Sequence, residues 1–218
     1  MINYQLETDR IIKSLDHAPT LLLHACCAPC SSYVLEYLAE HFNITVFFYN
    51  PNITEKEEYE KRKNELKRLI SEKSFRYPVK MIDGDYSPQL FFDMAKGKEH
   101  VPEGGERCFL CYEMRLKETA RLAKELQYEY FCTTLSVSPH KNVVKLNELG
   151  AKYSKEYDIP YLYSDFKKRN GYKRSIELSH EYGLYRQNYC GCVYSRMQTE
   201  RKEQEKNFQN EMKTVVKL

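Results

Sequence analysis

Short, continuous apolar runs alternate along the chain with segments whose apolar residues recur at helical spacing. The runs are typical of strands buried on both faces, and they fall at 20–23, 44–49, 79–82, 130–135 and 160–163. The helical spacing predicts helices over 31–41, 54–73, 113–126 and 142–157, with a polar helix or frayed tail after Arg196. This alternation predicts an α/β fold in which helices cover both faces of a Rossmann-like parallel sheet.

The organisation along the chain favours a single domain. No linker, internal repeat or low-complexity stretch interrupts the 218 residues, so we expect one α/β domain over 1–218. No apolar run approaches the roughly 18–20 residues of a membrane span, and the charged N-terminus lacks the apolar centre of a signal peptide. We therefore expect a cytoplasmic protein without a membrane partner, and a monomer because no long apolar interface helix stands out.

Charge is distributed unevenly between the two halves of the chain. Residues 1–107 carry 14 basic and 17 acidic side chains, whereas residues 108–218 carry 20 and 14. A basic segment at 164–196 holds seven of these basic side chains and five tyrosines. Lysine and arginine neutralise phosphates and aromatic rings stack on unpaired bases, so the segment favours a nucleic-acid partner. The alternative is a solvated lysine surface with tyrosines in the core.

Eight cysteines are unexpected in a chain without a secretion signal, where metal binding or redox chemistry is favoured over structural disulfides. Cys26, Cys27 and Cys30 stand in HACCAPCS between the first strand and the first helix, and Cys108 and Cys111 stand in RCFLCY at a helix start. A helix N-terminus favours the thiolate form. Two C-x-x-C pairs allow four sulfurs to reach one metal or cluster.

Several kinds of cysteine site remain open from the spacing alone. A structural four-cysteine zinc site and a thioredoxin-type redox centre are alternatives, although adjacent Cys26 and Cys27 fit a multi-iron cluster or two separate metals better. Cys190 and Cys192 flank one glycine, too close for an unstrained disulfide. They form a readily reduced electron relay or a second metal site, or they are two incidental thiols. Cys132 lies inside a predicted strand and is expected to be a core thiol.

The predicted strands place these motifs at one edge of the sheet. In parallel sheets, ligands bind at the carboxyl ends of the strands where the strand order reverses. The features expected at this edge are the cysteines after the first strand, Asp85 after the third, the Thr133–Thr134 region of the fourth and Asp165 after the fifth. We expect the functional site at this edge.

Five motifs in order give the chain a family resemblance: HACCAPCS, RCFLCYEMRL, TTLSVSPHKN, SDFKKRNGYKRS and YRQNYCGCVYS. Over about residues 20–196 it resembles the cobalamin-independent epoxyqueuosine reductases (QueH). The resemblance implies an adenine-nucleotide-hydrolase-like (HUP) α/β fold with cysteines replacing the ATP-pyrophosphatase loop. It also implies reduction of epoxyqueuosine at tRNA position 34 to queuosine with loss of water, the last step of queuosine formation.

The resemblance also implies roles for individual residues. Cys26, Cys27, Cys108 and Cys111 resemble the ligands of a [4Fe–4S] cluster, and Cys190 and Cys192 match a redox-active pair. Cys30 belongs to the first motif, where it either binds a second iron or replaces one cluster ligand. Asp85 and Asp165 are candidate proton donors or metal ligands, although surface or capping carboxylates are the alternative.

The implied partners are tRNA and an unidentified electron donor. His140 is a candidate for a phosphate contact or a plain loop histidine, and the candidates for the tRNA backbone are Lys141, Lys167, Lys168, Arg169, Lys173, Arg174 and Arg186. Two other functions stay open from the sequence: a zinc-stabilised RNA-binding module without catalysis, and a thiol–disulfide oxidoreductase.

Overall fold

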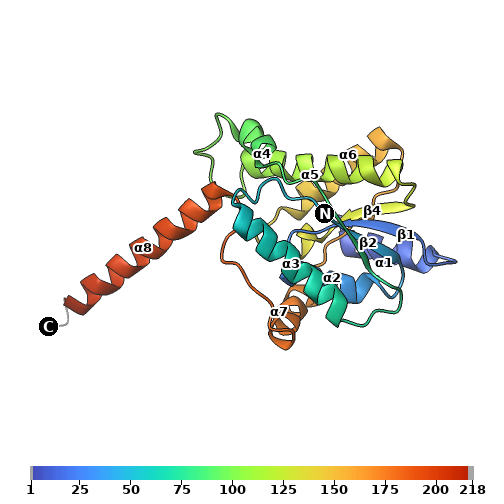
Figure 1. Ribbon diagram of the computed structural model, residues 1–218, viewed down its shortest axis with the longest axis horizontal. Helices are drawn as coiled ribbons and strands as arrows, with labels where there is room; N and C mark the ends of the chain where they lie inside the picture. The colour runs from blue at the N-terminus through green and yellow to red at the C-terminus, as the bar shows by residue number, and fades with distance from the viewer. Residues whose placement is uncertain (1, 216–218) are drawn as a thin grey trace.

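A four-stranded parallel sheet forms the centre of the computed structural model, which describes residues 2–215 (Figure 1). The strands are β1 (Thr20–His24), β2 (Asn43–Phe48), β3 (Lys80–Asp83) and β4 (Tyr130–Thr133), in the order β3-β2-β1-β4. Leu23 of β1 lies opposite Val46 on one side and Cys132 on the other. The α/β class and the parallel sheet expected from the sequence are thereby confirmed.

Helices cover both faces of the sheet, as the buried apolar runs predicted. On one face Leu21 and Leu23 pack with α2 (Ala28–Leu38) and α3 (Lys56–Glu72). On the other face Leu22 packs with α5 (Glu106–Glu125) and α6 (Val143–Tyr157). The side chains of β1 alternate between these two cores, which is why Leu21–Leu23 form a continuous apolar run.

Some elements differ from the sequence-based expectations. The fifth strand over 160–163 is wrong, because only a single parallel bridge joins Tyr161 to Phe131. The helix expected from residue 113 begins seven residues earlier as α5. Four further elements did not stand out in the apolar pattern: α1 (Tyr4–Ser14), α4 (Pro88–Ala95), the 3₁₀ helix Thr134–Val137 and α7 (Gly171–Glu181).

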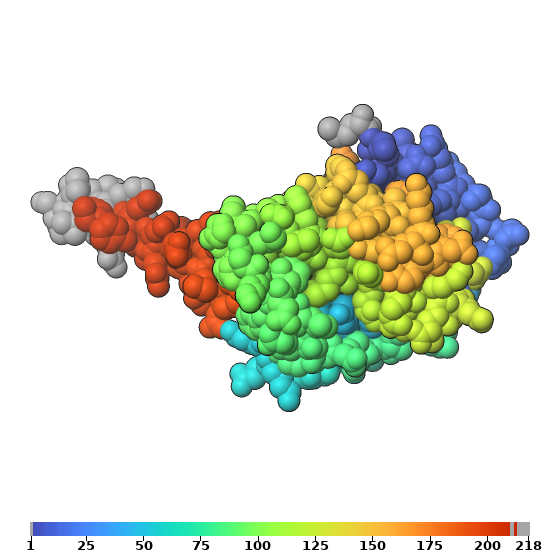
Figure 2. Space-filling model, turned by 90° about the horizontal axis from the view of Figure 1, so that it is seen from above, coloured from blue at the N-terminus to red at the C-terminus, as the bar shows by residue number. Residues whose placement is uncertain are grey.

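The last helix, α8 (Val193–Val215), leaves the body of the molecule and extends away from it (Figures 1 and 2). Its first turns contact the remainder of the chain: Ser195 donates to Glu103, Arg196 pairs with Glu55, and Glu203 accepts from Asn188. This agrees with the polar helix expected after Arg196. Within residues 2–215, no helix combines the length and apolar character required to cross a membrane.

The strand order reverses at β1, because β2 follows on one side of it and β4 lies on the other. Helices that connect parallel strands start at the carboxyl edge of the sheet. The first turns of α2 and α5 therefore both lie at this edge, and they carry the two C-x-x-C motifs.

Candidate functional site

Seven of the eight cysteines gather at the carboxyl edge of the sheet, and all are free thiols. Cys26 and Cys27 follow β1, and Cys30 lies in the first turn of α2. The sulfurs of these three lie within 4.8 Å of one another, and those of Cys26 and Cys27 are 3.6 Å apart. This triad has the spacing to hold a metal ion.

The three thiols of the triad share charge unequally. Hydrogen bonds from the Cys26 and Cys30 thiols hold the pKa of Cys27 well below its ordinary value, and the Arg62 charge contributes further. The contact with Cys27 raises the pKa of Cys26 to about 12, and hydrogen bonds with Cys26 and Cys27 raise the pKa of Cys30 well above its ordinary value. The triad therefore offers one thiolate and two neighbouring thiols as sulfur ligands for a cation.

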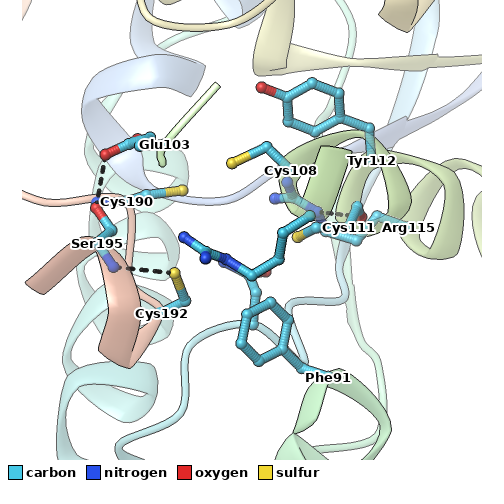
Figure 3. A pocket seen from close by; sticks show the side chains of 11 residues that line it. Phe91, Glu103, Cys108, Cys111, Tyr112, Arg115, Cys190, Cys192 and Ser195 are labelled. Carbon is cyan, nitrogen blue, oxygen red and sulfur yellow. Dashed lines mark hydrogen bonds between the residues drawn. The ribbon is translucent and has the colours of Figure 1, made fainter. Parts of the chain in front are cut away.

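A second group of four cysteines lines a small cavity (Figure 3). Cys108 and Cys111 project from the first turns of α5, opposite Cys190 and Cys192 from the segment before α8. The Gly104 N–H donates to the Cys108 Sγ at 3.3 Å, and the Ser195 N–H donates to the Cys192 Sγ at 3.3 Å. Gly191 between the latter pair has φ +120°, a conformation that favours glycine.

Cys190 makes the strongest ionic contact of this group. The Lys141 Nζ lies 3.1 Å from its sulfur and 3.3 Å from Glu103 Oε1. Burial alone raises the pKa of Cys190, but the charges of Lys141 and Arg115 outweigh it and lower the pKa. Burial raises the pKa of Cys192 to about 12. The structure thus pairs a thiolate-prone Cys190 with a protonated Cys192.

Three fully buried arginines surround the cysteines: Arg62, Arg107 and Arg115, each 1% exposed. Sequence reasoning missed all three, since arginine is usually a surface residue. The available signal was the spacing of Arg115, four residues after Cys111 on α5 and hence on the same helix face.

His24 anchors the carboxyl end of the central strand. Its ring is fully buried, with Nε2 3.1 Å from the Tyr49 carbonyl oxygen and Nδ1 2.9 Å from Thr133 Oγ1. Burial and the Arg115 charge lower the pKa of His24 to about 3. Neutral His24 therefore donates to the Tyr49 carbonyl and accepts from Thr133, tying β1 to β4 and to the end of β2.

A cleft of about 420 Å³ opens beside the thiols, and Cys26, Cys30 and Cys190 form part of its lining. Tyr172 and Tyr189 provide aromatic surface, and Lys141, Glu103 and Arg115 reach it as well. The cleft has the size and mixed lining of a small-molecule or nucleoside site.

The two predicted carboxylates lie apart from these cavities. Asp85 is exposed after β3, the strand at the far edge of the sheet from β4. Asp165 is 6% exposed and its Oδ1 lies 3.0 Å from Lys167 Nζ. Neither lines the cleft or the small cavity, whereas Glu103 lines both. Cys132 is buried in β4, with its sulfur 3.2 Å from the Leu162 carbonyl oxygen, as expected for a core thiol.

The seven predicted RNA-binding residues fall into different environments. Arg174 is bound to Glu36 through two hydrogen bonds of 2.9 and 3.0 Å, and Arg169 pairs with Asp9. Lys167 pairs with Asp165, and Lys141 lies inside the site. Those still open to a large partner are Lys168 and Lys173, which are exposed, and Arg186, which lines the cleft together with His140.

Comparison with known proteins gives consistent matches over most of the chain. A family model described as epoxyqueuosine reductase QueH matches residues 21–198. The epoxyqueuosine reductase QueH of Streptococcus pyogenes serotype M1 is 43% identical over 202 residues, which cover 88% of this chain and 79% of that protein. The Staphylococcus aureus (strain Mu50) protein of that name is 42% identical over 209 residues, covering 91% and 87%. The Thermotoga maritima protein is 34% identical over 192 residues, covering 85% and 95%.

Proposed function

The chain belongs to the epoxyqueuosine reductase QueH family, and from this premise we propose that it reduces epoxyqueuosine at tRNA position 34 to queuosine, with loss of water. The observation that carries the proposal is the gathering of seven cysteines beside a nucleoside-sized cleft at the reversal of the strand order. Reduction chemistry needs redox-active groups, and a large polar substrate needs an open site next to them.

We extend the proposal to the finer fold class. The strand order β3-β2-β1-β4 supports an adenine-nucleotide-hydrolase-like fold, in which the cysteines after β1 occupy the place of a phosphate-binding loop. Residues 1–218 are then one domain. The basic segment 164–196 contributes both α7 and the cysteine pair to it.

A [4Fe–4S] cluster held by Cys26, Cys27, Cys108 and Cys111 fits the residues present. Four thiolates are the usual ligands of such a cluster, and buried polar atoms of Arg107, Arg115 and Tyr112 beside these thiols have no partner. Cys26 and Arg115 also line the cleft, which offers room next to the thiols. When bound, the cluster supplies electrons one at a time. Cys30 would bind a second iron or replace one ligand.

The cleft is the proposed position of the modified nucleoside. Tyr172 and Tyr189 offer rings on which a flipped-out base stacks, and Arg186 and Lys202 lie within reach of its phosphates. Lys168 and Lys173 extend the basic surface toward the remainder of the anticodon arm.

Proton delivery is assigned to Lys141 and Glu103. Converting an epoxide to an alkene consumes two electrons and two protons, and the epoxide oxygen leaves as water. The Lys141 ammonium is 9% exposed and lines the cleft, so it is placed to protonate the departing oxygen. Glu103 is 32% exposed and connects Lys141 to solvent for reprotonation. The roles predicted for Asp85 and Asp165 gain no support from the places where these two side chains lie.

Cys190 and Cys192 are the proposed redox pair. Oxidation of the Cys190 thiolate and the Cys192 thiol to a disulfide releases two electrons and one proton, and an external electron donor of unidentified kind reduces the disulfide again. The Lys141 contact keeps Cys190 ready to react as a thiolate.

Anaerobic turnover tests the proposal most directly. The protein, reconstituted with iron and sulfide, is given tRNA containing epoxyqueuosine and a chemical reductant, and the nucleosides are read by mass spectrometry. Queuosine should form, Cys190→Ser should lose activity, and the matched core variant Cys132→Ala should keep it. A protein that binds only zinc and retains tRNA without turnover is the non-catalytic RNA-binding module. Metal-free disulfide exchange through Cys27 and Cys30 alone indicates a thiol–disulfide oxidoreductase.

A further inference from the structure

The three buried arginines of the site differ in how their charges are compensated. Arg62 donates to Glu58 Oε1 at 2.6 Å and to the Cys190 carbonyl oxygen at 3.0 Å. Arg107 donates from Nη1 to three backbone carbonyls of residues 98–101 at 2.5–2.9 Å, and its Nη2 has no partner. Arg115 donates only to the Cys111 carbonyl oxygen, at 3.2 Å, and its Nη2 has no partner.

No carboxylate forms an ion pair with Arg115 among the residues that the structure describes, although its side chain is 1% exposed. An uncompensated buried charge is strongly destabilising, so Arg115 is expected to face an anionic group. Arg115 lines the small cavity together with Cys111 and Cys190, and it lines the cleft together with Cys26 and Cys190. Arg115 therefore lies between the cysteine groups.

We propose that the Arg115 guanidinium is the counter-charge of the cofactor, so that it strengthens cofactor binding and raises the cofactor's reduction potential. This inference rests on the proposed function, since it takes the four-cysteine iron–sulfur cluster as the anion. A cluster with four thiolates carries net negative charge, and one more negative charge after reduction. A fixed positive charge in a dry site stabilises the reduced form more than the oxidised form. Arg115 is thus a positioning and tuning residue, not a group that meets the substrate's reacting atoms.

The first test compares reduction potentials in the full-length, reconstituted protein. Arg115→Met removes the charge at similar volume, Arg115→Lys keeps it, and Arg121→Met removes an exposed charge on the same helix. Anaerobic redox titration followed by visible absorption and electron paramagnetic resonance should give a more negative potential for Arg115→Met. The potential of Arg115→Lys should shift less, and the potential of Arg121→Met should stay unchanged. An unchanged potential in Arg115→Met overturns the inference.

The second test measures how much the cofactor stabilises the fold. A ligand that binds only the native state raises the urea midpoint in proportion to its affinity. Loading with the cofactor should therefore raise the urea midpoint less in Arg115→Met than in the unmodified chain. After a challenge with a chelator, Arg115→Met should also retain less iron per chain. An equal rise of the urea midpoint in both proteins overturns the inference. An unmodified chain that takes up no iron contradicts the proposed function itself, which separates the two failures.

Discussion

The contact between Lys141 and Cys190 predicts a specific loss of thiol reactivity in Lys141→Met. The Nζ–Sγ distance is 3.1 Å and the lysine side chain is 9% exposed, so solvent screens the pair weakly. A hydrogen bond to a charged group contributes about 1.5–3 kcal/mol, which corresponds to roughly tenfold to a hundredfold in the thiolate population. Because Lys141 helps to lower the pKa of Cys190, its removal raises that pKa.

The assay is alkylation of the metal-free protein by iodoacetamide under anaerobic conditions, with Cys190 followed by peptide mass spectrometry. At neutral pH the Cys190 rate should fall roughly tenfold to a hundredfold in Lys141→Met, and the rate–pH profile should move to higher pH. Lys141→Arg keeps the positive charge and should restore most of the rate. The matched control is Lys145→Met, which removes a partly exposed lysine paired with Glu148. If all four proteins share one profile, Lys141 does not set the reactivity of Cys190.

Three further predictions follow from buried or exposed groups outside the thiols. The pKa of His24 is near 6.5 in the unfolded chain and about 3 in the folded chain, so the free energy of unfolding falls as pH drops through this window. Measured by urea unfolding, its decrease between pH 6.5 and 5 should be about 1.5 kcal/mol larger than in His24→Gln. Gly171→Ala places a Cβ 2.0 Å from the Phe166 carbonyl oxygen, which cannot retreat easily, and should lower the free energy of unfolding by about 1–3 kcal/mol in the same assay. Lys168→Ala with Lys173→Ala should weaken tRNA binding and reduce its salt slope by about 1–2, by filter binding at several salt concentrations; an unchanged slope contradicts a phosphate contact.

Much of the fold could be predicted from continuous apolar runs, because β1 and β2 are buried on both faces and tolerate no polar alternation. The positions of Cys26 and Cys108 could be predicted too, because a strand–loop–helix order places each helix start at the same edge. The run over 160–163 misled the prediction for a physical reason. Its apolar side chains are buried against β4, but only Tyr161 forms a bridge, so the segment packs as an edge without continuing the sheet.

The remainder of the site depends on tertiary packing that local patterns do not encode. Lys141 was assigned to the tRNA surface on charge alone, yet it is inserted between Glu103 and Cys190, which come from distant segments. Arg115 lies on a helix with an ordinary charged sequence, and only the assembled sheet buries it. Asp165 is the converse case, since it follows the predicted fifth strand but pairs with Lys167 and lines neither cavity.

The order of strands in the sheet also has a consequence for how the chain reaches its native state. β1 must pair with β4, and the bond between His24 and Thr133 spans 109 residues of sequence. Pairing at such separation is slow, because the loop entropy is lost before the contacts form. Until it is complete, the thiols after β1 and those of α5 remain far apart and open to oxygen. Reductant present during refolding should therefore affect the yield of active protein more than reductant added after folding is complete.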